Sequence, residues 1–177
     1  MAVLQTTRLT LRPCHPGDRT DFIDLERDPE VMRFLNGGYA VDPENPDPNS
    51  TFLMPRGTEP HVWTARRAGG DAFVGWFCLW PENAAVAELG YRLCRKDWGQ
   101  GLASEGALAL VDWGFRKGGY NRIVATTMAV NLASRRVMEK LGMRHTRTEH
   151  IDWPAPIPGG EQGEVWYEMA HMEWKDG

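Results

Sequence analysis

The chain has 177 residues, of which 42% are hydrophobic and 25% are charged, with a formal net charge of −4 at pH 7. This length is enough for one domain with its own core, and we expect a single domain over residues 1–177. The acidic balance excludes proteins that bind nucleic acid or anionic membranes through a broad basic surface.

The cysteines and the N-terminus indicate the compartment. Cys14, Cys78 and Cys94 are scattered and form no C-x-x-C pair, so the sequence predicts neither a disulfide framework nor a metal site. Residues 1–10 hold no apolar signal-peptide core, and no apolar stretch is long enough to span a bilayer. We therefore expect a cytoplasmic protein with no metal, no membrane and no nucleic-acid partner.

The first third of the chain predicts one strand, two short helical segments and a loop. Polar and apolar residues alternate over 5–13, which indicates a strand with one solvated face. Apolar spacing predicts a short helix that ends before Pro29, and then a helical turn over 31–35. Residues 42–60 contain five prolines, so we interpret them as a surface loop that includes a short helix over 50–54.

The rest of the chain alternates strands with helices. The predicted strands and helices are strands 61–67, 71–80, 84–93, 122–128 and 164–169, and helices 101–117 and 131–141. An antiparallel meander is thus followed by a β-helix-β-helix unit and by closing strands. This order predicts an α+β fold with a mixed, mostly antiparallel central sheet flanked by helices, and excludes a doubly wound sheet.

The most informative segment is the strand-to-helix turn over residues 98–105, which reads Trp-Gly-Gln-Gly-Leu-Ala-Ser-Glu. A helix that starts here exposes unpaired backbone N–H groups at the positive end of its dipole, and small residues let a phosphate approach them. The segment lacks the Lys-Ser or Lys-Thr of a P-loop, and Ser104 takes the third glycine position of the dinucleotide motif. These residues alone leave two interpretations: a pyrophosphate site, and a tight turn that binds nothing.

Two further segments accompany this turn. Residues 87–93 read Ala-Glu-Leu-Gly-Tyr-Arg-Leu, and residues 131–143 read Asn-Leu-Ala-Ser-Arg-Arg-Val-Met-Glu-Lys-Leu-Gly-Met. Together the three segments resemble the GNAT superfamily of acetyl-CoA-dependent N-acetyltransferases, and in particular its RimJ/RimL branch. The resemblance covers nearly the whole chain. It implies a GNAT-like fold, acetyl-CoA as co-substrate, an amine acceptor, and compatibility with a homodimer.

The resemblance also implies a cofactor site. The backbone amides that would hold the pyrophosphate are those of Gly99, Gln100, Gly101, Leu102, Ala103 and Ser104. The main chain of Tyr91, Arg92 and Leu93 would pair with the pantetheine arm as a neighbouring strand does. Asn131 would form a hydrogen bond with the cofactor where the second long helix begins. Trp98 departs from the superfamily pattern, which has Gln or Arg at that position, in a form that the RimJ/RimL branch shares.

The same resemblance points to Ser134 as a catalytic residue. Many superfamily members place a tyrosine seven residues after the asparagine, as the acid for the departing thiolate. Here that position is Met138, which has no proton to donate. Ser134 lies three residues after Asn131, as in the RimJ/RimL branch, and would either protonate the thiolate or donate a hydrogen bond to it. The alternative is an exposed hydroxyl near the start of a helix.

Two glutamates are candidates for the base. Glu88 lies on the face of its strand opposite Leu89 and Tyr91, and two interpretations are open: a general base that acts through water, or an ion-pair partner of Arg92. Glu105 lies in the first helical turn, where we favour a capping role. A peptide α-amino group, whose pKa is about 7.7–8.0, has a neutral fraction at pH 7 that makes a base dispensable.

The sequence favours direct acetyl transfer, because Cys78 and Cys94 have no histidine nearby to activate them as nucleophiles. The acceptor is a peptide N-terminus or a small-molecule amine. One alternative is a non-catalytic acyl-CoA-binding regulatory module, which would share the same turn. Another is a nucleotide or phosphate binder that takes no thioester.

Overall fold

The computed structural model describes residues 2–39, 42, 55–152 and 157–174. The strands and helices are β1 (Leu4–Gln5), β2 (Leu9–Pro13), α1 (Arg19–Glu26), α2 (Pro29–Asn36), β3 (Val62–Arg67), β4 (Phe73–Pro81), β5 (Val86–Leu93), α3 (Leu102–Arg116), β6 (Arg122–Met128), α4 (Leu132–Lys140), β7 (Arg144–Glu149) and β8 (Glu164–Ala170). The strands form one eight-stranded sheet in the order β1-β2-β3-β4-β5-β6-β8-β7. Neighbours are antiparallel except β5 and β6, which confirms the predicted α+β fold.

Two sequence predictions and one strand that was not predicted need comment. The single strand over 5–13 is wrong, because the chain forms β1 and β2 as a hairpin whose turn carries Thr6. The strand β7 was not predicted: five of its six side chains are exposed, so its sequence shows no apolar alternation. The predicted helix over 50–54 lies outside the described residues. No helix among those that are described is long and apolar enough to span a membrane.

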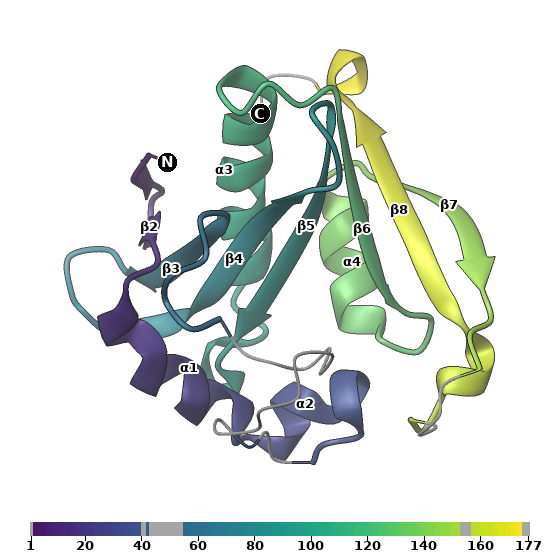
Figure 1. The fold of residues 1–177 in the computed structure, drawn as a ribbon, viewed down its shortest axis with the longest axis horizontal. Coiled ribbons are helices and arrows are strands. Elements are labelled where there is room, and N and C mark those ends of the chain that lie inside the picture. The colour runs from purple at the N-terminus through teal and green to yellow at the C-terminus, as the bar shows by residue number, and fades with distance from the viewer. Residues whose placement is uncertain (1, 40–41, 43–54, 153–156, 175–177) are drawn as a thin grey trace.

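The sheet opens between β5 and β6. These two strands pair only where Val86–Glu88 meets Arg122–Val124. Beyond that point they diverge, and α4 lies beside β6 in the opening (Figure 1). On its other edge β5 stays paired with β4 as far as Leu93. Within the described chain, residues 89–93 therefore have one strand edge without a partner, next to the start of α3.

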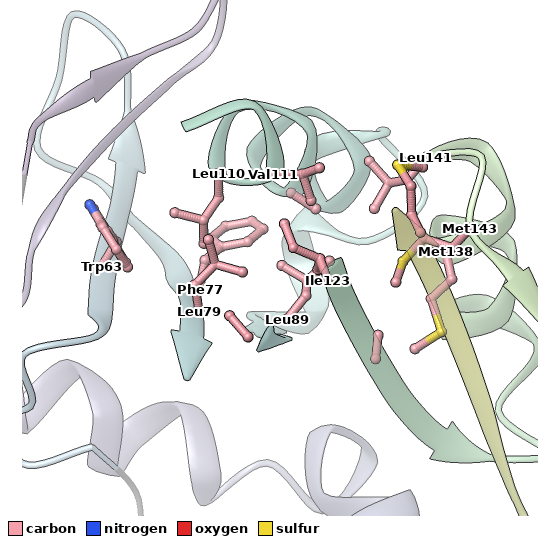
Figure 2. Packing of buried hydrophobic residues seen from close by; sticks show 14 of the residues in the cluster. Trp63, Phe77, Leu79, Leu89, Leu110, Val111, Ile123, Met138, Leu141 and Met143 are labelled. Atoms are coloured by element: carbon pink, nitrogen blue, oxygen red, sulfur yellow. The ribbon is translucent and has the colours of Figure 1, made fainter. Parts of the chain in front are cut away.

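One face of the sheet carries the main core. Leu110 and Val111 of α3 pack above Phe77, and Ile123 lies beside them (Figure 2). Small residues let α3 approach β4, since a Cβ at Gly106 would lie 2.4 Å from the Phe77 ring. The apolar stripe on α3 was predicted from its spacing, and its burial fixes the helix start against the strands.

The helices α1 and α2 lie along the lower ends of β3–β5 in Figure 1 and make a second, smaller core. Leu25, Val31 and Met32 are buried there against Phe73 and Trp76 of β4. A register shift in the pairing of β4 with β3 near Gly75 adds one residue to β4, so Phe73 and Trp76 face the second core while Val74 and Phe77 face the main one. Even-numbered side chains of β5, which lies next to β4, face the same side as α1.

Candidate active site

The turn before α3 has the features of an anion-binding site. Gly99 and Gly101 have φ of 71° and 79°, left-handed values that favour glycine. Gly101 is the N-cap residue of α3 and makes no side-chain cap. Across the described residues, no backbone N–H from Gly99 to Ser104 donates a hydrogen bond to a protein group. A row of free donors at the positive end of a 15-residue helix is the arrangement that binds phosphate.

Two arginines that the sequence did not single out hold this turn. Arg8 donates from Nη1 to the Gln100 carbonyl at 2.8 Å. Arg67 donates from Nη2 to Asp97 Oδ1 at 2.5 Å and to Gln100 Oε1 at 2.9 Å. Arg8 lies in the turn between β1 and β2, and Arg67 lies at the end of β3. Their partners are 92 and 30 residues away in the sequence, so no local motif reveals these contacts. They fix the turn and add positive charge beside it.

Glu105 does not cap the helix, so the capping role expected for it is wrong. Its carboxylate accepts hydrogen bonds from Thr6 Oγ1 at 2.6 Å and from the Arg8 backbone N–H at 2.8 Å, and it pairs with the Arg8 guanidinium. Burial acts to raise the pKa of Glu105, but these bonds from Thr6 and Arg8 hold it below its usual value. Glu105 therefore ties the β1–β2 turn to the first turn of α3.

The strand β5 presents different groups on its two faces. Tyr91 and Leu93 face the main core, and Arg92 points to the other side, where it forms a buried ion pair with Glu26 of α1. The interpretation of Glu88 as the partner of Arg92 is therefore wrong. The Leu93 carbonyl already accepts a hydrogen bond from the Trp98 indole at 2.8 Å, which gives the unusual Trp98 a structural role.

Glu88 faces the same side as Arg92 but is not paired with a basic side chain of the described residues. Its Oε1 accepts a hydrogen bond from Thr126 Oγ1 at 3.0 Å, and no basic side chain of the described chain forms an ion pair with it. Burial raises the pKa of Glu88, against the opposing effect of the Thr126 bond, and Glu82 raises it further. A half-buried carboxylate with a raised pKa and a free oxygen has the properties of a general base.

The start of α4 places Ser134 across the opening from β5. Ser134 Oγ lies 2.9 Å from the Tyr91 hydroxyl, and its backbone N–H donates to Asn131 Oδ1 at 3.3 Å. Ser134 is half-buried, so the alternative of an exposed hydroxyl is wrong. By accepting the bond from the Ser134 N–H, Asn131 serves as the N-cap of α4, and it also donates from Nδ2 to Thr127 Oγ1 at 3.1 Å. Its amide retains one N–H and one lone pair for a ligand.

These features coincide with a known family. The family model of the acetyltransferase (GNAT) domain matches residues 8–144, which is most of the chain. The chain belongs to the GNAT acetyltransferase family. A curated relative, the FsC-acetyl coenzyme A-N(2)-transacetylase of Aspergillus fumigatus, is 35% identical over 97% of this chain and 77% of its own length. This protein is therefore an acetyl-CoA-dependent N-acetyltransferase.

Solved structures agree on the fold. A GNAT acetyltransferase from Bacillus anthracis has a TM-score of 0.78, with 23% identity over 97% of this chain and all of the other. RimL, a ribosomal L7/L12 alpha-N-protein acetyltransferase solved with coenzyme A, has a TM-score of 0.73, with 17% identity over 96% of this chain and 98% of its own. At these identities the likeness shows the GNAT fold alone.

The residues present fit acetyl-CoA. The free amides from Gly99 to Ser104 suit the pyrophosphate of this GNAT co-substrate. The unpaired edge of residues 89–93 offers main-chain partners to the amides of a pantetheine arm.

The cysteine thiols of the protein are poor nucleophiles, since burial raises the pKa of Cys78 to about 12 and also raises that of Cys94. Cys94 follows β5 and is not part of a strand.

A Gly99→Ala variant is expected to lose about 10–100-fold in CoA affinity, because Ala disfavours left-handed φ by about 1–2 kcal/mol and the turn would re-aim its amides. Gly69→Ala is a matched control, since Gly69 has φ of 74° and, like Gly99, open space where a Cβ would lie. Both variants should lose similar stability, but only the first should lose affinity in calorimetric titration. Equal CoA affinity in the two variants would contradict a phosphate site at this turn.

Proposed function

We propose that this protein transfers the acetyl group of acetyl-CoA directly to a primary amine, either a peptide N-terminus or a small-molecule amine. The free backbone amides between Gly99 and Ser104 carry this proposal, since they would aim a thioester into the opening between β5 and β6. Glu88 of β5 and Ser134 of α4 then flank the reacting atoms. The names of two relatives, an N(2)-transacetylase and an alpha-N-protein acetyltransferase, support an amine acceptor.

In this mechanism the neutral amine nitrogen attacks the thioester carbon, and the proton that the nitrogen loses passes to Glu88, directly or through a water. Backbone N–H groups of the free edge of β5, near Tyr91 to Leu93, stabilise the negative oxygen that develops. The C–S bond then breaks with its electron pair on sulfur, and Ser134 donates a hydrogen bond to the thiolate. A thiolate of ordinary pKa near 8.5 is a good leaving group, so a hydrogen bond is sufficient.

The test measures release of the free CoA thiol with a panel of peptides that have free N-termini and a panel of small primary amines. Release well above thioester hydrolysis, with an N-acetylated product seen by mass spectrometry, is expected for at least one panel. Tight CoA binding with no product in either panel would favour a non-catalytic acyl-CoA module. Stronger thermal stabilisation by ATP or NAD than by CoA would favour a nucleotide binder.

A further inference from the structure

The hydroxyl of Tyr91 bridges the opening between β5 and α4. It lies 2.9 Å from Ser134 Oγ and 3.1 Å from the Ser134 carbonyl oxygen. The Tyr91 ring is partly buried in the main core, and its centroid lies 6.2 Å from that of Phe77. The phenol is thus held by packing, and its polar end is the group that contacts Ser134.

The number of hydroxyl protons distinguishes two hydrogen-bond arrangements of Tyr91 and Ser134. The phenol has one proton, and so does the serine hydroxyl. If the Tyr91 hydroxyl donates to the Ser134 carbonyl oxygen, the Ser134 hydroxyl donates to the phenol oxygen. The serine proton is then not available to a ligand. If Tyr91 donates to Ser134 Oγ, the serine proton is free to point at a sulfur, and the first hydrogen bond polarises the second and strengthens it.

We propose that Tyr91 is a positioning residue, which donates to Ser134 Oγ and thereby directs the serine proton to the sulfur of CoA. This inference rests on the proposed function, since it assigns a role within the same transfer reaction. The backbone of Tyr91 lines the cofactor edge, but its hydroxyl acts only through Ser134.

The pair works as a hydrogen-bond donor and not as an acid. Burial raises the pKa of Tyr91 to about 12, although the bond with Ser134 opposes this. A thiol has a pKa of about 8.5, so a proton on either oxygen stays there when the thiolate forms. The thiolate accepts a hydrogen bond from Ser134 and later takes its proton from solvent or from the base.

The test compares CoA with desulfo-CoA, which lacks the sulfur, as ligands of three variants. Tyr91→Phe and Ser134→Ala should each weaken CoA binding about tenfold near pH 9, where the thiolate is abundant, and should leave desulfo-CoA binding unchanged. The double variant should be no worse than either single variant, because both remove the same hydrogen bond. Tyr120→Phe is the control, since Tyr120 is a buried tyrosine beyond the far end of α3.

Three results would overturn the inference. Equal weakening of CoA and desulfo-CoA by Tyr91→Phe would mean that Tyr91 only supports the structure. Unchanged CoA binding in Tyr91→Phe, with a loss in Ser134→Ala, would mean that Ser134 needs no tyrosine. Unchanged CoA binding in both variants would show that Ser134 forms no hydrogen bond to the sulfur. The ligand comparison needs no acceptor, so an absence of acetyl transfer would count against the proposed function and not against this inference.

Discussion

A Glu88→Gln variant is expected to acetylate amines about 10²–10⁴-fold more slowly than the natural chain, because glutamine cannot take the proton that the attacking nitrogen loses. The fold should persist, since Gln keeps the shape of the side chain and can still accept the hydrogen bond from Thr126. The loss should appear in kcat, with little change in CoA affinity, because Glu88 faces away from the core side of β5. Steady-state kinetics with a saturating acceptor measure this.

The pH dependence of the acetylation rate gives a second test of Glu88 as the base. Glu88 is a base only as a carboxylate, so its contribution falls as pH drops through its pKa, which burial raises above the ordinary value of about 4.3. The ratio of natural to variant rates should therefore narrow as pH is lowered. Glu168→Gln is the control, because Glu168 lies two strands away in the same register row and faces Arg122. A Glu88→Gln rate within about threefold of the natural rate would show that no base acts at this position.

A Glu26→Ala variant is expected to lose about 3–5 kcal/mol of stability, because it leaves the Arg92 guanidinium buried without its partner. The Glu26 side chain is 0% exposed, and Arg92 also lies over the Trp76 ring with 5.0 Å from guanidinium carbon to ring centroid. For a chain of this size the loss corresponds to a fall in Tm of roughly 6–20 °C. Thermal and urea unfolding measure it.

Two further variants define the cause of that loss. Glu26→Leu combined with Arg92→Met should recover most of the stability, since apolar side chains of similar volume remove both buried charges. Asp24→Ala is the control, because Asp24 forms an exposed pair with Arg27 and should cost at most about 0.5 kcal/mol. A loss below about 1 kcal/mol in Glu26→Ala would contradict a buried ion pair.

The pair of Glu26 and Arg92 also makes the stability of the fold depend on pH. Burial raises the pKa of Glu26 to about 7 in the folded chain, although Arg92 lowers it, whereas an unfolded glutamate has a pKa near 4.3. The folded state therefore binds the Glu26 proton more tightly than the unfolded state does, so the stability that protonation of Glu26 contributes is present below about pH 4 and is lost as pH rises through 7. Glu26→Gln should lack that loss.

Local sequence was enough to predict the elements that form the candidate cofactor site. The glycines at 99 and 101 specify a left-handed turn by their own chemistry, and the apolar spacing of α3 follows from one buried face. The alternation of Glu88 with Leu89 correctly separated the two faces of β5. These signals need no knowledge of distant residues.

The features that sequence could not predict depend on long-range contacts. Arg92 meets Glu26 across 66 positions, and Tyr91 meets Ser134 across 43, so no spacing rule links them. The strand β7 pairs at the edge of the sheet with an almost wholly exposed sequence, which lacks the apolar pattern that marks a strand. Glu105 was assigned to a cap because the turn of β1–β2 that binds it was not foreseen.

The bond network of Glu105 has a practical consequence for protein engineering. Thr6 and Arg8 brace the helix start that would receive the co-substrate, and Ala2 is itself anchored through its carbonyl to the Trp63 indole. Shortening the chain at its beginning, or fusing a rigid partner there, would disturb ligand binding at a distance along the polypeptide.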